Sequence, residues 1–185
     1  MEIILPEIWI AIESHNSYIC NYIQGPIIVM GELKMAKAPL ALERFLPYRL
    51  SVLTNRVSGA LSRHYADRFG IGIPEWRVIA ILGRYAGLSA NQVAERSAMD
   101  KVTVSRAVAA LEAKGLLDRE RDDGDKRKSR LTLSGQGQKV YAEIAPLALG
   151  FERELLTVLS AEEAAQLDRI IDKLNAKMDE LAAER

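Results

Sequence analysis

A dense cluster of positive charge lies in the second half of the sequence, where four cations fall within five residues. They follow the turn-forming sequence Asp-Asp-Gly-Asp at positions 122–125, and they are Lys126, Arg127, Lys128 and Arg130. Side chains of this kind suit ion pairing with phosphates and insertion into a narrow minor groove. The cluster holds more positive charge than solubility requires, so contact with a polyanion is the interpretation we favour.

A second group of candidate contact residues lies on a helix expected just before this cluster. From the natural N-cap Asp100 to Gly115, apolar residues recur at i, i+3, i+4 and i+7, a stripe made of Val104, Ala107, Val108 and Leu111. The opposite face is small and polar except for one arginine, and it carries Val102, Thr103, Ser105, Arg106 and Ala109. Small residues let a helix approach the major groove, while Arg, Ser and Thr reach base edges and phosphates. If this helix stood alone, we would interpret the face as an ordinary solvated surface. Because the basic cluster follows directly, we predict instead that the helix reads DNA.

The preceding residues predict three further helices that position this one. The first carries a stripe at three- and four-residue spacing and should end near Gly70 and Gly72; the stripe is Leu46, Leu50, Leu53, Val57, Ala60, Leu61 and His64. The second begins at Pro74 and should end at Gly83 to Gly87. The third begins at a capping box of Ser89 and Gln92 and runs to about Ser97.

The residues around the basic cluster change from helical to alternating periodicity. Residues 116–121 and 129–133 form short alternating runs on either side of the turn, which predicts a β-hairpin. A charged hairpin that directly follows a pair of helices is typical of the wing of a winged-helix domain. The predicted fold class is therefore mainly α with a small β-hairpin wing, a winged helix-turn-helix domain plus a helical dimerisation domain.

Two long helices are expected after the hairpin. The first opens at Ser134 and Gly135, and Pro146 should kink or divide it. The second begins at a capping box of Ser160 and Glu163 and carries an apolar seam of Leu167, Ile170, Ile171, Leu174, Met178 and Leu181. Such a seam needs a partner, and we expect the first helix and the same helices of a second subunit to supply it in a homodimer.

Composition restricts the remaining possibilities. The formal net charge is zero, so attraction to nucleic acid must come from a local patch. The single cysteine, Cys20, excludes intramolecular disulfides and Cys-based zinc fingers, and the two histidines, His15 and His64, are far apart in the sequence. We therefore predict no metal and no cofactor. We also expect a cytoplasmic protein. Neither a phosphate-binding glycine loop nor a plausible Ser-His-Asp set is present, so an enzyme is not expected.

Residues 1–39 form an N-terminal extension of uncertain status. Its first 33 residues contain no Lys or Arg, and its apolar start is too short for a membrane span and lacks the basic region of a signal peptide. We therefore expect no contact with a membrane. Two interpretations of residues 1–34 remain: an arm that packs on the domain or on a dimer partner, or non-native sequence upstream of a true start at Met30 or Met35, which we favour slightly.

The sequence from about Leu42 to Leu181 resembles the multiple-antibiotic-resistance regulator (MarR) family of winged-helix repressors. The most specific segment is LSANQVAERSAMDKVTVSRAVAALEAKGLLDRERDDGDKRKSRLTLSGQG, residues 88–137, with its Leu-Glu-x-x-Gly-Leu, Asp-x-Arg and Leu-Thr-x-x-Gly elements. The resemblance implies DNA contacts at Ser89, Asn91, Lys101, Thr103, Ser105, Arg106, Asp125, Lys126, Arg127 and Lys128, with Asp125 orienting Arg127 for the minor groove. It also implies a two-fold dimer on a double-stranded, pseudo-palindromic DNA operator. The domains implied are 73–135 for DNA binding and 40–72 with 136–185 for dimerisation.

The resemblance also implies a small-molecule effector. Family members often bind small aromatic acids or aromatic acyl-CoA thioesters in a cleft between the dimerisation helices and the winged domain. Residues that could line such a cleft here are Tyr48, Arg49, His64, Tyr65, Trp76, Arg84 and Tyr85, although most of them could equally be core or surface residues. The alternative function is an architectural or protein-interaction winged-helix module without a small-molecule effector.

Overall fold

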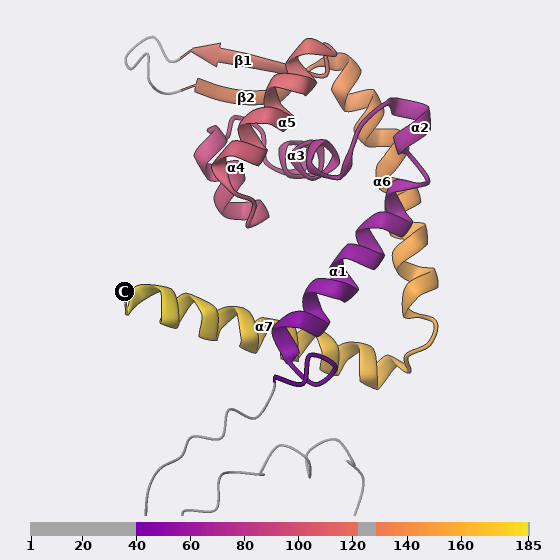
Figure 1. Cartoon of the computed structure of the whole chain (residues 1–185). Coiled ribbons are helices and arrows are strands. Elements are labelled where there is room, and N and C mark those ends of the chain that lie inside the picture. The colour runs from indigo at the N-terminus through magenta and orange to yellow at the C-terminus, as the bar shows by residue number, and fades with distance from the viewer. Residues whose placement is uncertain (1–39, 122–128, 185) are drawn as a thin grey trace, which may run out of the picture. The chain divides into compact units, whose positions relative to one another are not determined.

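The computed structural model describes residues 40–121 and 129–184, and Ala41–Arg185 forms one compact unit distinct from Met1–Leu40 (Figure 1). The described elements, in chain order, are α1 (Leu46–Ser62), α2 (Ala66–Phe69), α3 (Ile73–Arg84), α4 (Ala90–Ser97), α5 (Lys101–Ala113), β1 (Leu117–Arg121), β2 (Ser129–Leu133), α6 (Gly135–Leu156) and α7 (Ala161–Ala183). This confirms the predicted class, mainly α with one two-stranded hairpin. Within the described residues, no helix is long and apolar enough to cross a membrane.

The first predicted helix is broken in the structure, so its expected continuation to Gly70 was wrong. α1 ends at Ser62, and the short α2 follows after a turn in which the backbone N–H of Tyr65 donates to the carbonyl of Ser62 at 3.1 Å. The turn carries the side chain of Tyr65 into the core, where it is 1 % exposed. α2 ends at Phe69, and its C-cap residue Gly70 has a left-handed φ of 63°, which suits glycine.

The predicted caps of the next helices are confirmed. At α4, the Ser89 hydroxyl accepts from the backbone N–H of Gln92 at 3.3 Å, and the Gln92 side chain accepts from the N–H of Ser89 at 2.8 Å. At α5, a carboxylate oxygen of Asp100 accepts from the backbone N–H of Thr103 at 2.8 Å. α3 continues past Gly83 to Arg84, one residue beyond the earliest end we expected. Local hydrogen bonds therefore fix where both helices of the helix-turn-helix begin.

The hairpin is antiparallel, and its register pairs Leu117 with Leu133 and Arg121 with Ser129. The turn between α3 and α4 joins its other edge, because Leu131 accepts from the N–H of Gly87 at 3.0 Å and donates its own N–H to the carbonyl of Leu88 at 2.8 Å. The base of the wing is thereby hydrogen-bonded directly to the helix-turn-helix.

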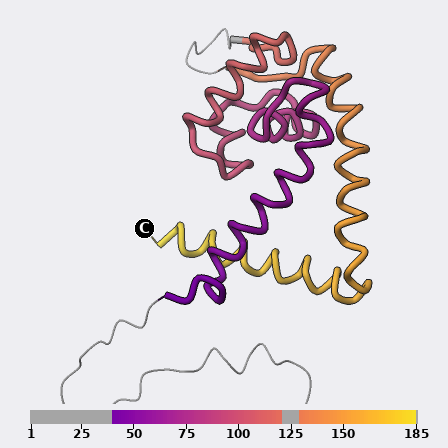
Figure 2. The backbone as a smooth tube through the Cα atoms, turned by 45° about the vertical axis from the view of Figure 1, so that its right-hand side comes forward, coloured from indigo at the N-terminus to yellow at the C-terminus, as the bar shows by residue number. Residues whose placement is uncertain are grey.

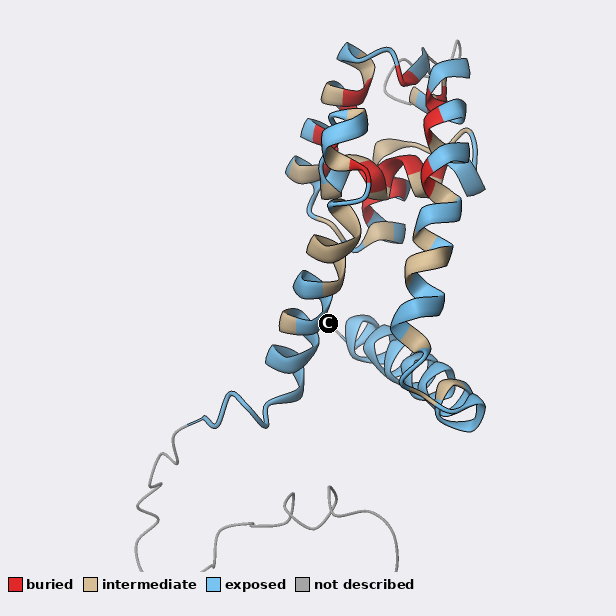
Figure 3. Cartoon of the chain, turned by 90° about the vertical axis from the view of Figure 1, so that its right-hand side faces the viewer, coloured by how far each residue is buried: buried red, intermediate tan, exposed pale blue. Residues whose placement is uncertain are grey.

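The core lies among α3, α4, α5 and the hairpin, where the buried residues gather in Figure 3. All four residues of the predicted inward stripe of α5 are buried: Val104, Ala107, Val108 and Leu111. The core also takes side chains from outside residues 73–135, namely Tyr65, Ile71, Val140 and Ile144. An aromatic stack links these parts, since the ring centroids of Tyr65 and Trp76 are 5.7 Å apart and those of Trp76 and Tyr141 6.4 Å apart.

α6 runs from the winged part to the turn before α7 as one helix, so of the two predicted effects of Pro146, a kink or a division, the division does not occur (Figure 2). Proline removes the hydrogen bond to the carbonyl four residues earlier, here that of Ala142. Both Ala142 and Pro146 are exposed, so water can satisfy that carbonyl without breaking the helix.

α7 begins at the predicted capping box, in which Ser160 and Glu163 each accept a backbone N–H from the other. None of its residues is buried within this chain, as Figure 3 shows. Its apolar seam is exposed, from Leu167 at 39 % to Met178 at 62 %.

Candidate nucleic-acid interface

The two faces of α5 differ as the sequence predicts. The buried stripe packs against α3 and α4, while the opposite face is exposed and consists of Lys101, Val102, Ser105, Arg106 and Ala109. Three of the predicted DNA contacts, Lys101, Ser105 and Arg106, therefore lie together on an accessible helix face. Arginine can donate two parallel hydrogen bonds to a guanine, and lysine can pair with a phosphate.

Thr103 has a different role from its neighbours. Its hydroxyl donates to one carboxylate oxygen of Asp100 at 2.6 Å, and its backbone N–H donates to the other at 2.8 Å. Both bonds lower the pKa of Asp100 below its ordinary value, and the bond from the side chain of Thr103 has the larger effect. The hydroxyl proton of Thr103 is thus used in the helix cap, which leaves it only acceptor capacity toward a ligand.

The start of α4 is the second part of the candidate interface. Ser89 is half-buried at the N-cap and Asn91 is exposed in the first turn. The backbone N–H groups of a helix N-terminus attract phosphate, and the amide of Asn91 adds donors beside them. Both residues therefore lie at the N-terminus of α4, and their contact with a phosphate stays a prediction.

The wing is attached to the recognition helix through an ion pair that the sequence reasoning missed. Arg119 on β1 donates from Nε and Nη2 to the two carboxylate oxygens of Glu112 on α5, at 2.7 and 3.0 Å. The hydrogen bond to Glu112 raises the pKa of Arg119 above its ordinary value. No local pattern announces this pair, because its two residues lie seven positions apart on different elements and only the turn between α5 and β1 brings them together. The predicted contacts Asp125, Lys126, Arg127 and Lys128 lie outside the described residues.

The C-terminal end of α5 is also fixed. The ammonium group of Lys114 donates to the carbonyl of Gly70 at 2.6 Å and to a carboxylate oxygen of Glu75 at 2.7 Å. Glu75 accepts from the backbone N–H of Gly72 as well. α5 is therefore held at its start by Asp100 and at its end by Lys114, so its exposed face has a defined orientation.

The residues proposed for an effector cleft are not brought together by the structure. Tyr65 and Trp76 are core residues. Tyr85 is exposed at the end of α3, with the guanidinium of Arg96 4.4 Å from its ring centroid and that of Arg84 at 5.3 Å. The other candidates lie elsewhere: Tyr48 and Arg49 line an open pocket at the start of α1, and the ring of His64 lies 6.0 Å from that of Phe151.

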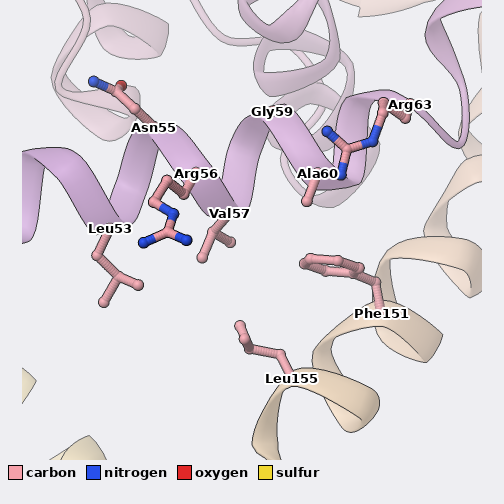
Figure 4. A pocket seen from close by; sticks show the side chains of 9 residues that line it. All are labelled: Leu53, Asn55, Arg56, Val57, Gly59, Ala60, Arg63, Phe151 and Leu155. Atoms are coloured by element: carbon pink, nitrogen blue, oxygen red, sulfur yellow. The ribbon is translucent and has the colours of Figure 1, made fainter.

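A larger pocket, of about 610 Å³, lies between α1 and α6. Figure 4 shows Val57 and Ala60 of α1 and Phe151 and Leu155 of α6 around the same space. The side chains lining it also include two cations, Arg56 and Arg63, together with Leu53 and Asn55. The sequence reasoning missed both arginines, although their separation of seven residues places them on one face of a helix. Within the described residues, no group of three or more His, Cys, Asp or Glu could hold a metal ion.

Comparison with known proteins agrees with this geometry. A model of the MarR family matches residues 69–128. The transcriptional regulator HosA of Escherichia coli O127:H6 is 30% identical over 101 residues, which cover 55% of this chain and 75% of that protein.

Solved structures extend the match to the helices outside the winged part. The crystal structure of a MarR/EmrR family transcriptional regulator from Acinetobacter sp. ADP1 is similar with a TM-score of 0.70 and 30% identity, over 75% of this chain and 98% of that one. The PcaV transcriptional regulator from Streptomyces coelicolor, in complex with its natural ligand, has a TM-score of 0.60 and 25% identity, over 80% of this chain and 98% of that one. This chain belongs to the MarR family of winged-helix, DNA-binding transcriptional regulators.

Proposed function

We propose that the protein is a homodimeric repressor that binds a pseudo-palindromic DNA operator and is released from it by a small aromatic carboxylate or an aromatic acyl-CoA. The observation that carries the DNA-binding part is the exposed face of α5, where Lys101, Ser105 and Arg106 stand on a helix anchored at both ends. In this arrangement α5 enters the major groove, Arg106 reads a guanine, and Lys101 pairs with a phosphate. Ser89 and Asn91 add phosphate contacts from α4, and the wing tip, with Asp125 and Arg127, meets the adjacent minor groove.

The dimer is supported by the apolar surface of α1 and α7. α7 exposes Ile170, Ile171 and Leu174 by 40 to 52 %, and α1 exposes Leu50 and Leu53 by 47 and 57 %. Several large apolar side chains exposed on one helix face are typical of an association surface. A two-fold axis through these helices presents two copies of α5 to two half-sites.

The pocket between α1 and α6 supports the effector part of the proposal. Its volume of about 610 Å³ suits a small aromatic molecule. Phe151 offers an aromatic wall, and Arg56 and Arg63 offer guanidinium groups for the carboxylate of an aromatic acid or for the phosphates of an acyl-CoA. PcaV, to which this chain is similar, was crystallised in complex with its natural ligand. This precedent supports a small-molecule ligand for this chain as well. A ligand here would favour a spacing of the two recognition helices that does not fit half-sites one DNA turn, ~34 to 36 Å, apart.

DNA recognition is tested on the region upstream of the protein's own gene, by footprinting and then by competition with random duplex. Arg106→Ala should cost ~1 to 3 kcal/mol per half-site and reduce the preference for the operator. Arg169→Ala, which removes an exposed arginine from α7, is the control and should leave that preference intact. Equal binding of operator and random duplex by the wild-type protein would instead indicate an architectural module.

Effector release is tested with a panel of benzoates, hydroxybenzoates and their CoA thioesters. An active compound should weaken operator binding by roughly 5- to 150-fold, and Arg63→Ala should remove most of that response while keeping ligand-free DNA affinity. Arg49→Ala is the matched comparison, because Arg49 lines the neighbouring pocket at the start of α1, which shares Leu53 and Arg56 with the first pocket but not Arg63. If Arg49→Ala abolishes the response and Arg63→Ala does not, the effector binds at the start of α1.

A further inference from the structure

Val102 is an apolar side chain in an unusual place. It is 58 % exposed in the first turn of α5, on the face that also carries Lys101 and Arg106. Among the described residues between 54 and 146, the large apolar side chains that are exposed are Tyr85 and Val102. The other exposed large apolar side chains of the described residues lie at positions 40–53 and 147–181, on or next to α1, α6 and α7.

Neither folding nor helix stability accounts for this valine. Its exposure shows that it adds little to the core, and β-branched residues are poorer helix formers than Ala, Glu or Lys. The hydroxyl of Thr103, the next residue, is turned back to Asp100, so it does not accompany Val102 on the exposed face. The first turn of α5 therefore offers an apolar branched group to whatever the helix meets.

The chemistry of the major groove contains one matching group, the 5-methyl group of thymine. The N-terminal residues of a recognition helix are those that reach base edges. Val102 and Arg106 are four residues apart, so they share a helix face and are separated by about 6 Å along the axis, against about 3.4 Å between stacked base pairs. We propose that Val102 is a specificity-determining residue that contacts a thymine methyl group, one or two base pairs from the base read by Arg106. The inference rests on the proposed entry of α5 into the major groove.

The test replaces thymine by deoxyuridine, which keeps every hydrogen-bonding group and lacks only the methyl. The full-length protein first selects its site from a random duplex library. Each thymine of that site is then replaced in turn, in both half-sites together, and affinity is measured by competition. At one position, wild-type binding should weaken by roughly fourfold for each methyl removed.

Val102→Ser identifies the residue responsible, since it should bind the thymine and deoxyuridine versions of that position equally. Val158→Ser is the matched control, because Val158 is another exposed valine, 82 % accessible and close to the turn before α7; it should keep the full discrimination. Equal losses in Val102→Ser and in the wild type, or a selected site whose deoxyuridine series is flat, would overturn the assignment of Val102 and leave the proposed function standing. A library that yields no preferred sequence would overturn both.

Discussion

Glu112 on the recognition helix and Arg119 on the first strand of the wing are joined by two parallel hydrogen bonds. Both side chains are about one-third accessible, so solvent screens the pair and its contribution to the free energy of unfolding should be less than about 1 kcal/mol. Its main effect should be on DNA binding, because it fixes the wing relative to α5. We expect Glu112→Gln to weaken operator binding by roughly 2- to 10-fold, since the wing must then be ordered at each encounter.

Asp118→Asn provides the comparison, because it removes one carboxylate from the strand residue next to Arg119. Fluorescence anisotropy with a labelled operator measures both affinities, and urea unfolding measures both stabilities. If Glu112→Gln binds operator as tightly as the wild type, the ion pair does not control the position of the wing.

The cap of α5 should make stability depend on pH in a defined direction. The pKa of Asp100 is lowered in the folded state, so its ionised form stabilises the fold at neutral pH, and that stabilisation is lost as the pH falls through the carboxylate range. Asp100→Ala should therefore be less stable than the wild type at about pH 7, and the gap should narrow at about pH 3. Asp100→Asn, which caps without titrating, should lose less at neutral pH.

Urea unfolding of the three proteins at both pH values gives these differences directly. Glu163, whose pKa is lowered by its bonds with Ser160, titrates in all three proteins and cancels in the comparison. A gap between wild type and Asp100→Ala that widens on acidification would contradict the proposed role of the ionised cap.

The exposed seam of α7 should be essential for dimerisation. Ile171→Asp combined with Leu174→Asp places four like charges at a two-fold interface, and we expect monomers that no longer protect a full operator. The control is Ala165→Asp with Ala176→Asp, which adds the same charge to the opposite face of the helix at 100° per residue. Sedimentation velocity should show a dimer for the control and a monomer for the seam variant. If both variants are monomers, or both are dimers, the seam of α7 is not the dimer interface.

Gly137 in the first turn of α6 should tolerate no side chain. A Cβ atom there would collide with the carbonyl oxygen of Leu116, whereas a Cβ at Gly135, two residues earlier, would meet nothing within 4 Å. Gly137→Ala should therefore lower the free energy of unfolding by about 1 to 3 kcal/mol. Gly135→Ala should leave it unchanged or raise it by up to about 1 kcal/mol. Thermal unfolding measures both, and equal stability of the two variants would mean that the contact relaxes without cost.

The features predicted correctly from the sequence are those that neighbouring residues determine. The Ser89, Asp100 and Ser160 caps are bonds between residues three apart, and the buried stripe of α5 follows from helical periodicity alone. The two strands of the wing were also predicted correctly, because the alternating pattern that indicates each strand lies within one short run of residues. Such features need no knowledge of the remainder of the fold.

The errors arose where distant parts of the chain decide the outcome. The break after Ser62 serves the burial of Tyr65 against Trp76, and nothing in the local pattern of residues 46–70 announces it. The pocket between α1 and α6 combines Arg63 with Phe151, which only the packing of two helices brings together. Aromatic residues taken for cleft walls, Tyr65 and Trp76, were instead needed to fill the core.

Gly83 faces the ring of Tyr141 so closely that a Cβ atom would lie 2.6 Å from two ring atoms. The ring is in turn nearly parallel to that of Trp76, at an interplanar angle of 23°. Sliding of α3 along α6 would separate these two rings, so we expect the two helices to move together. We expect any bending to occur outside this contact, for example in the turn at residues 63–65 or in the turn at residues 157–160. Through these two short segments, a movement of α1 or α7 could reorient α5.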